Sequence, residues 1–159
     1  PAMIVALVLI ARSGTAVATE LANMHLNQEL EALEAHGIPP HAFVVLPRLL
    51  AFPIAALCLT LYFIFIALAG GLATIPVFYA QPLQLSLDAL LREIRSIDLL
   101  LPMAKSVLFG GLIALCCSFH GLSVRRSFRE VPQATTRGVT ASFGLCMVAN
   151  TLLSLAAFL

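Results

Sequence analysis

The chain has 159 residues, of which 60% are hydrophobic and only 11% are charged, and its formal net charge is +1. Soluble globular domains are about a quarter charged, so the mean hydropathy of +1.00 excludes most soluble enzymes. The small net charge, with no basic patch interleaved with aromatic residues, argues against a nucleic-acid partner.

Four apolar segments follow one another along the chain, and the uncharged runs within the last three are each long enough to cross a bilayer, which takes about 20 helical residues. The second begins a run without Asp, Glu, Lys or Arg that extends from Leu49 to Leu87. The sequence therefore predicts an all-α polytopic membrane protein, a single transmembrane domain over residues 1–159. The predicted segments are Pro1 to about Thr19 (interrupted by Arg12), about Leu49 to Ile75, Met103 to Val124, and Gly138 to Phe158.

The first segment starts at Pro1 rather than at Met, and no basic region precedes it, which is not the pattern of a signal peptide. We expect that an earlier part of this helix, and of the domain, is missing. The cysteines lie in apolar runs without Cys-x-x-Cys spacing, so they are interpreted as small packed residues rather than as a metal or disulfide site. They are Cys58, Cys116, Cys117 and Cys146.

Three polar stretches connect the segments: Glu20 to Arg48, Pro76 to Pro102, and Arg125 to Arg137. The first and third lie on one side, because two spans separate them. That side carries more Lys and Arg, which predicts that it is cytoplasmic. Its cations are Arg12, Arg48, Arg125, Arg126, Arg129 and Arg137, against Arg92, Arg95 and Lys105 on the other side. The segment from Leu87 to Ile94 suggests an amphipathic helix at the opposite interface.

The first polar stretch predicts a short cytoplasmic helix from Met24 to His36. An apolar stripe runs along one face, Gly37 is placed to cap the end, and two prolines forbid continuation. The stripe is Leu26, Leu30 and Leu33; the opposite face carries Gln28, Glu31 and Ala35; the prolines are Pro39 and Pro40.

This helix has two interpretations. It could be a plain amphipathic connector on the membrane surface. Its carboxylates at Glu29, Glu31 and Glu34 would however repel an anionic leaflet, which attracts Lys and Arg instead. An acidic face favours a protein partner with a basic groove, and a short helix before a span is typical of the coupling helix that a permease presents to its ATPase.

Small residues within the spans are expected to serve ordinary helix packing. They are Ala67 with Gly71, and Gly70, Gly110, Gly111 and Gly144. Asn150, the most polar residue of the last segment, is expected to face protein, because an exposed amide in hydrocarbon is costly. Whether it does more than pack is open at this point.

Several motifs resemble, in order and over essentially the whole chain, the MlaE/YrbE permease family, the membrane subunits of ABC transporters that move phospholipids or related lipids alongside MCE proteins. The motifs are Ala11-Arg-Ser-Gly-Thr, Thr19-Glu-Leu-Ala-Asn-Met, Asn27-Gln-Glu-Leu-Glu-Ala-Leu, His36-Gly-Ile-Pro-Pro, Leu46-Pro-Arg, Lys105-Ser-Val-Leu-Phe-Gly and Ala134-Thr-Thr-Arg-Gly-Val. The departures from the family pattern are Ala22 for glycine, the reversed order of Gln28 and Glu29, Pro39 for an acidic residue, Pro132 for glycine and Asn150 for aspartate.

The resemblance implies a multi-pass permease of a bacterial inner membrane that moves phospholipids or related lipids between the inner and outer membranes. Its implied partners are a separate ABC ATPase, a periplasmic MCE-domain protein and a second permease copy in a homodimer. The expected coupling residues are Glu20, Met24, Gln28, Glu29, Glu31, Leu33, Glu34 and Gly37. The residues considered for a lipid path are Arg12, Lys105 and Asn150.

No cofactor, metal or catalytic residue is predicted, and the sequence has no Gly-x-x-x-x-Gly-Lys-Ser/Thr phosphate-binding run, so ATP hydrolysis is expected in a partner chain. The alternative is an ATP-independent secondary transporter or an assembly scaffold. Secondary transporters usually carry ionisable residues inside their spans, whereas His120 is the only one here that titrates near neutral pH, and it lies near a span end.

Separate predictions concern three charged residues, Arg12, Glu20 and Lys105. Arg12 and Glu20 lie about 12 Å apart along a helix axis, too far to pair, so Arg12 is expected to find a partner within the bundle and Glu20 one near the short helix. The alternative is that both reach the lipid headgroups. Lys105 either anchors the span at the outer headgroups or faces the path of a lipid phosphate.

Overall fold

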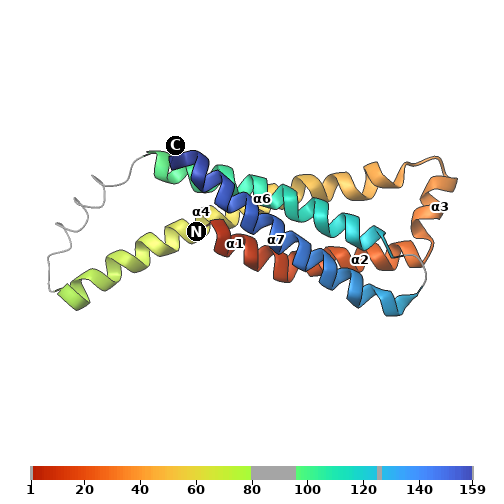
Figure 1. The fold of residues 1–159 in the computed structure, drawn as a ribbon, viewed down its shortest axis with the longest axis horizontal. Coiled ribbons are helices and arrows are strands. Elements are labelled where there is room, and N and C mark those ends of the chain that lie inside the picture. Colours follow the sequence, from red (N-terminus) through yellow and green to blue (C-terminus); the bar gives the residue numbers. More distant parts are fainter. Residues whose placement is uncertain (1, 80–95, 125–126, 159) are drawn as a thin grey trace.

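The computed structural model describes residues 2–79, 96–124 and 127–158, and all regular structure within these ranges is helical (Figure 1). The all-α prediction is therefore confirmed. In chain order the elements are α1 (Ala2–Leu9), the π-helical turn η1 (Ile10–Gly14), α2 (Thr15–Leu26), α3 (Glu29–Ala35), the π-helical turn η2 (His41–Val45), α4 (Leu46–Tyr79), α6 (Ser96–Leu122), the short 3-10 helix η3 (Phe128–Glu130) and α7 (Val131–Phe158).

Four helical stretches are long and apolar enough to cross a membrane, as the sequence predicts. They are Ala2–Leu26, Ala42–Thr74, Leu99–Leu122 and Phe128–Ala156. The first joins α1, η1 and α2 into one continuous helix, which runs past the predicted end at Thr19. A helix continues as long as its backbone hydrogen bonds do, so its end need not coincide with the end of its apolar composition.

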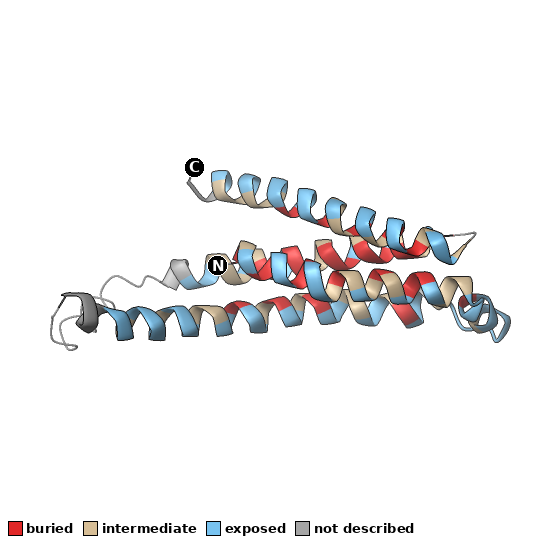
Figure 2. Cartoon of the chain, turned by 90° about the horizontal axis from the view of Figure 1, so that it is seen from below, coloured by how far each residue is buried: buried red, intermediate tan, exposed pale blue. Residues whose placement is uncertain are grey.

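Helix α6 is the centre of the bundle and packs against α1, α2, α4 and α7. Buried residues lie along the facing sides of the helices, while the outward sides are exposed (Figure 2). The central cluster draws on every spanning helix. It includes Ala6, Leu9, Ile10, Ala18, Phe52, Ala56, Phe109, Ile113, Cys117 and Cys146.

Glycines bring some helix backbones into direct contact. A Cβ placed on Gly110 would lie 2.7 Å from the Cα of Pro53, and one on Gly121 would lie 2.8 Å from the carbonyl oxygen of Ala18. Gly110 thus confirms the predicted small-residue packing, and Gly121 is a contact that the sequence analysis missed. At the other predicted positions a Cβ would meet no atom within 4 Å in the part of the chain that the structure describes: Gly70, Gly71, Gly111 and Gly144.

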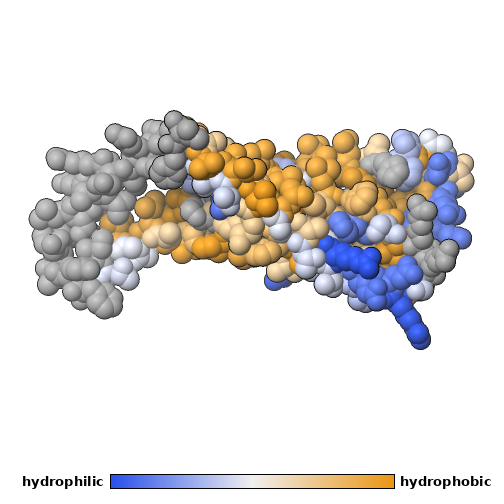
Figure 3. All heavy atoms as spheres, in the orientation of Figure 1, coloured by the Kyte–Doolittle hydropathy of each residue, from blue (hydrophilic) through white to orange (hydrophobic). Residues whose placement is uncertain are grey.

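Successive spans alternate in direction, so α3 and the connection between α6 and α7 lie at the same end of the bundle (Figure 1). Hydrophilic residues gather at that end (Figure 3). The predicted pairing of the first and third polar stretches is therefore confirmed. The predicted amphipathic segment from Leu87 to Ile94 lies outside the described residues, as do Arg125 and Arg126.

Candidate functional site

Helix α3 lies across the end of the bundle, between the end of α2 and the start of α4 (Figure 1). Its Leu30 is 8% exposed and forms a buried cluster with Leu21 and Val44. Leu33 packs against the same cluster. Two leucines of the predicted stripe therefore attach α3 to the bundle, as an amphipathic helix should.

The predicted extent of this helix, from Met24 to His36, is wrong at its beginning. Helix α2 continues to Leu26, Gln28 takes a left-handed conformation with φ 60°, and α3 begins only at Glu29. Met24 consequently belongs to the last turn of α2. The break has a physical reason: a straight continuation would carry Leu30 away from the bundle along the axis, whereas the turn allows it to reach its buried neighbours.

The third residue of the predicted stripe packs elsewhere because of this break. Leu26 lies against a second buried cluster, between α2 and the start of α7. That cluster consists of Ala22, Val124, Val131 and Ala134.

The predicted glycine cap of α3 is confirmed. Gly37 has φ 77°, its amide donates to the carbonyl of Glu34 at 2.9 Å, and the amide of Ile38 donates to the carbonyl of Leu33 at 3.1 Å. This is the Schellman pattern, in which a left-handed residue satisfies carbonyls that the helix end leaves free. The cap fixes where α3 stops and turns the chain toward α4.

The outward face of α3 is acidic. Glu29, Glu31 and Glu34 are all exposed, while Leu30 and Leu33 on the same helix face the bundle. Gln28 and Ala35 are exposed as well, as predicted for that face. Three carboxylates on one short, anchored helix form a rigid negative surface, which a basic protein groove would complement.

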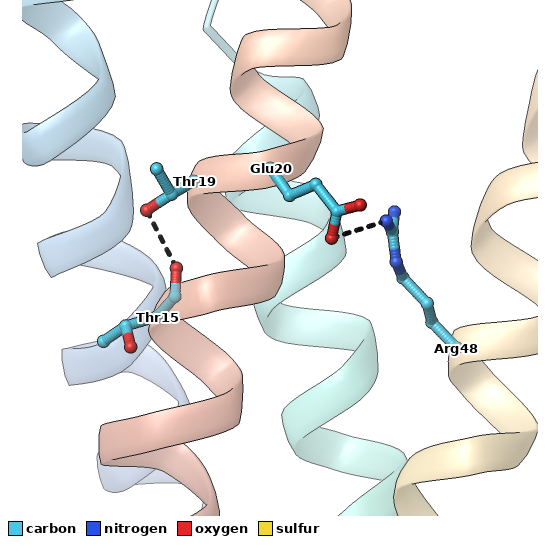
Figure 4. Close-up of polar contacts among 4 residues, drawn as sticks. All are labelled: Thr15, Thr19, Glu20 and Arg48. Atoms are coloured by element: carbon cyan, nitrogen blue, oxygen red, sulfur yellow. Dashed lines mark hydrogen bonds and ion pairs between the residues drawn. The ribbon is translucent and has the colours of Figure 1, made fainter.

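An ion pair joins the two helices on either side of α3. Arg48 Nη2 of α4 lies 2.9 Å from Glu20 Oε2 of α2 (Figure 4). The Glu20 side chain is 60% exposed and that of Arg48 only 18%, so solvent screens the pair in part. The pair closes the loop that contains α3. The pair confirms the prediction that Glu20 has a protein partner near the short helix, although Arg48 was not predicted as that partner.

Arg12 lies on the surface rather than in the bundle, and its side chain makes no ion pair or hydrogen bond with the described residues, so the expectation of a partner within the bundle is wrong. It belongs to η1, the widened turn between α1 and α2, and its side chain is exposed. The hydroxyl of Thr15 donates to the carbonyls of Ala11 and Arg12, at 2.9 Å each. Turns of this π-helical kind are rare and frequently occur at functional sites.

At the end of the bundle opposite α3, Lys105 contacts α7. Its Nζ donates to Ser154 Oγ at 2.8 Å, and both side chains are partly buried. Asn150, also partly buried, precedes Ser154 by one turn of α7. The structure thus brings two of the three considered lipid-path residues to one helix pair. Ser154 was not singled out, because a lone serine in an apolar run gives no signal.

Two of the sequence motifs also meet. Thr19 Oγ1 on α2 and Thr135 Oγ1 on α7 are 3.1 Å apart, and Thr19 also donates to the carbonyl of Thr15 (Figure 4). The four cysteines are free. Within the described parts of the chain, no three His, Cys, Asp or Glu side chains are grouped so that they could hold a metal ion.

The sequence of the chain is similar to those of several known proteins. The chain is 28% identical over 152 residues to a probable ABC transporter permease protein of Synechocystis, with 96% of this chain and 58% of that protein covered. It is 26% identical over 152 residues to the chloroplastic protein trigalactosyldiacylglycerol 1 of Arabidopsis thaliana, covering 96% of this chain and 43% of that one. A probable ABC transporter permease protein of Rickettsia prowazekii is 26% identical over 148 residues, with 93% and 57% covered.

The chain thus spans about half the length of the curated relatives it matches. The model of the family Permease MlaE matches residues 1–156. With four helices long and apolar enough to cross a membrane and a family match over nearly its whole length, the chain is a multi-pass membrane protein that belongs to the MlaE permease family.

Proposed function

We propose that the chain is part of a lipid-transporting ABC permease in a bacterial inner membrane, which moves phospholipids or related lipids between the inner and outer membranes. A separate ATPase subunit supplies the energy. The name of the Arabidopsis relative contains that of a galactolipid, and the family is that of MlaE permeases. Both support lipid as the transported class.

The observation that carries the proposal is the construction of α3. Its leucines attach it to the bundle, its carboxylates project away, and the Glu20–Arg48 pair joins the helices on both sides. A push on α3 is thereby transmitted to α2 and α4 together. ATP binding in the partner can then shift the equilibrium between two packings of the spans, provided that the partner contacts α3 differently in each.

The test is co-purification of the ATPase with the full-length permease in mild detergent. Changing Glu29, Glu31 and Glu34 together to Lys should abolish co-purification, because three favourable contacts become repulsive. The matched control changes the same residues to Gln, which removes charge without reversing it and should weaken binding only partly. Unchanged co-purification of the Lys variant, with normal membrane insertion, would show that α3 does not dock the ATPase.

The further partners that we propose are a second copy of the permease and a periplasmic MCE-domain protein. Large apolar side chains on α4 and α7 are exposed on this chain alone, including Tyr62, Phe65, Val148, Leu152 and Leu155. In a membrane such faces meet lipid or another helix. These exposed faces of α4 and α7 are available for contact with a second copy of the permease.

For the lipid path we propose the helix pair that carries Lys105 and Asn150. An ammonium binds phosphate well as a point charge, and the Ser154 contact holds Lys105 partly buried between α6 and α7. Lys105→Met should lower phospholipid transfer and lipid co-purification while ATPase docking persists, and Lys105→Arg should largely retain both. Transport at the parent rate in Lys105→Met would leave Lys105 as an anchor only.

A further inference from the structure

A polar hollow opens between the end of α6 and the start of α7, at the same end of the bundle as α3. Its volume is about 450 Å³, within the range of small-molecule sites. It is distinct from the acidic face of α3 and from the Lys105 region. The lining residues are His120, Ser123, Val124, Glu130, Gln133, Ala134 and Arg137.

This hollow is lined by an arginine and a glutamate that form no ion pair with each other. Arg137 is exposed and Glu130 partly buried, and the ion pair formed among the described residues is that of Glu20 with Arg48, not one between these two. Two opposite charges that share a hollow without pairing suit a ligand that itself carries both signs.

Further polar groups complete the lining. His120 Nδ1 bonds to the carbonyl of Cys116 at 2.9 Å, so Nδ1 carries the proton and Nε2 remains available. Ser123 Oγ donates to the carbonyl of His120 at 2.7 Å and can accept a second bond. The hydrogen bonds to backbone carbonyls thus orient both side chains, while His120 Nε2 and Ser123 Oγ can still accept hydrogen bonds.

A second, shallow hollow of about 380 Å³, lined by exposed residues, adjoins the first and shares Gln133 and Arg137 with it. Its other lining residues are Pro132, Thr136 and Thr140. These three recur at intervals of four along α7 and therefore lie on one helix face leading from the polar end into the apolar span. A molecule with a charged head in the first hollow can extend its body along this face.

From these observations we infer that the paired hollows bind the headgroup of a zwitterionic phospholipid with a primary amine. Arg137 binds the phosphate as a charge-assisted donor, and Glu130 accepts hydrogen bonds from the ammonium, as Nε2 of His120 can. The glycerol part lies along the Pro132–Thr140 face. The site belongs to the leaflet at the α3 end. The choice of a lipid ligand rests on the proposed function, but the test measures binding rather than transport.

The experiment uses the full-length permease with its partners, purified in mild detergent and loaded with phosphatidylethanolamine or phosphatidylglycerol. Native mass spectrometry counts the lipids retained. Arg137→Gln should lower retention of phosphatidylethanolamine about tenfold, as expected when a charge-assisted hydrogen bond is lost. Glu130→Gln should remove the preference for phosphatidylethanolamine over phosphatidylglycerol. Arg137→Lys, which keeps the charge, should retain most binding.

The matched control is Arg129→Gln. Arg129 is an exposed arginine on the neighbouring η3 and does not line either hollow. It should leave both lipids retained as in the parent. An equal loss in the Arg129 variant would mean unspecific attraction and would overturn the site.

Two further outcomes would also overturn it. Displacement of the lipid by millimolar inorganic phosphate alone would make this an oxyanion site rather than a headgroup site. Loss of ATPase co-purification in Arg137→Gln with unchanged lipid retention would make it a protein contact. If the parent transports lipid but no variant changes lipid retention, this inference fails while the proposed function stands.

Discussion

The uncharged part of α4 has two halves, residues 49–60 and residues 61–74, which are similarly apolar, yet only the first half has a buried side. In the first half, Phe52, Ala56 and Thr60 recur every fourth residue and are all buried. In the second half, Tyr62 is 67% and Phe65 is 72% exposed. This half extends past the bundle, as Figure 1 shows. Hydropathy alone would not distinguish them.

The difference teaches what holds helices together in a membrane. Lipid tails are as apolar as leucine, so an apolar side chain gains little from exchanging lipid for another helix, and close backbone approach decides instead. The first half of α4 faces Gly110 of α6, which admits the backbone of Pro53. The second half has Gly70 and Gly71, but no atom of the described residues lies within 4 Å of a Cβ placed on either of them.

The largest expected effect comes from filling the α4–α6 contact. Gly110→Val should destabilise the folded protein by about 3 kcal/mol or more, the upper range for overpacked cores, because its Cβ would lie 2.7 Å from a Pro53 backbone atom that cannot move alone. Size-exclusion chromatography of heated samples in detergent measures the loss. The matched control is Gly111→Val, whose Cβ meets nothing within 4 Å. Equal losses at both positions would contradict the packing argument.

A smaller effect is expected from paired truncations on the two halves. Phe52→Ala should cost about 1–3 kcal/mol, less than in soluble cores, since mainly packing is lost. Phe65→Ala should change the stability of the isolated chain by less than about 0.5 kcal/mol, as for other exposed positions. Size-exclusion chromatography of heated samples measures the stability of both variants. If Phe65→Ala destabilises only the assembled transporter, we would conclude that another chain covers the second half of α4. The two halves would then differ in which chain they pack against.

The smallest effects concern the two left-handed residues that bracket α3, the helix that precedes α4. Gly37→Ala should destabilise α3 by about 1 kcal/mol, because a Cβ is disfavoured at φ 77°. Gln28→Gly should be neutral or stabilising by less than about 1 kcal/mol, since it removes that same cost at φ 60°. Hydrogen exchange of the amides of residues 29–38 measures both. If these amides exchanged faster in Gln28→Gly than in Gly37→Ala, the explanation by left-handed backbone strain would be wrong.

Several features could be predicted from single segments. Four spans, their alternation, the cap at Gly37 and the acidic outer face of α3 all appear in the structure as the sequence indicates. Each depends on the composition of one stretch or on the backbone preference of one residue. The candidate site was predictable to the same extent: Glu29, Glu31 and Glu34 are exposed as expected, whereas the helix that carries them begins later than expected.

By itself, then, the sequence determined which stretches cross the membrane and which helix face is polar, because those properties are local. Only the tertiary structure decided that α2 breaks before Gln28, that Arg48 meets Glu20, and that Gly110 rather than Gly111 admits a neighbouring backbone. These depend on distances between residues far apart in the chain. In a bilayer, whether two helices pack closely depends on the shapes of a few contacting residues and not on their hydropathy. Apolar composition therefore does not predict such contacts.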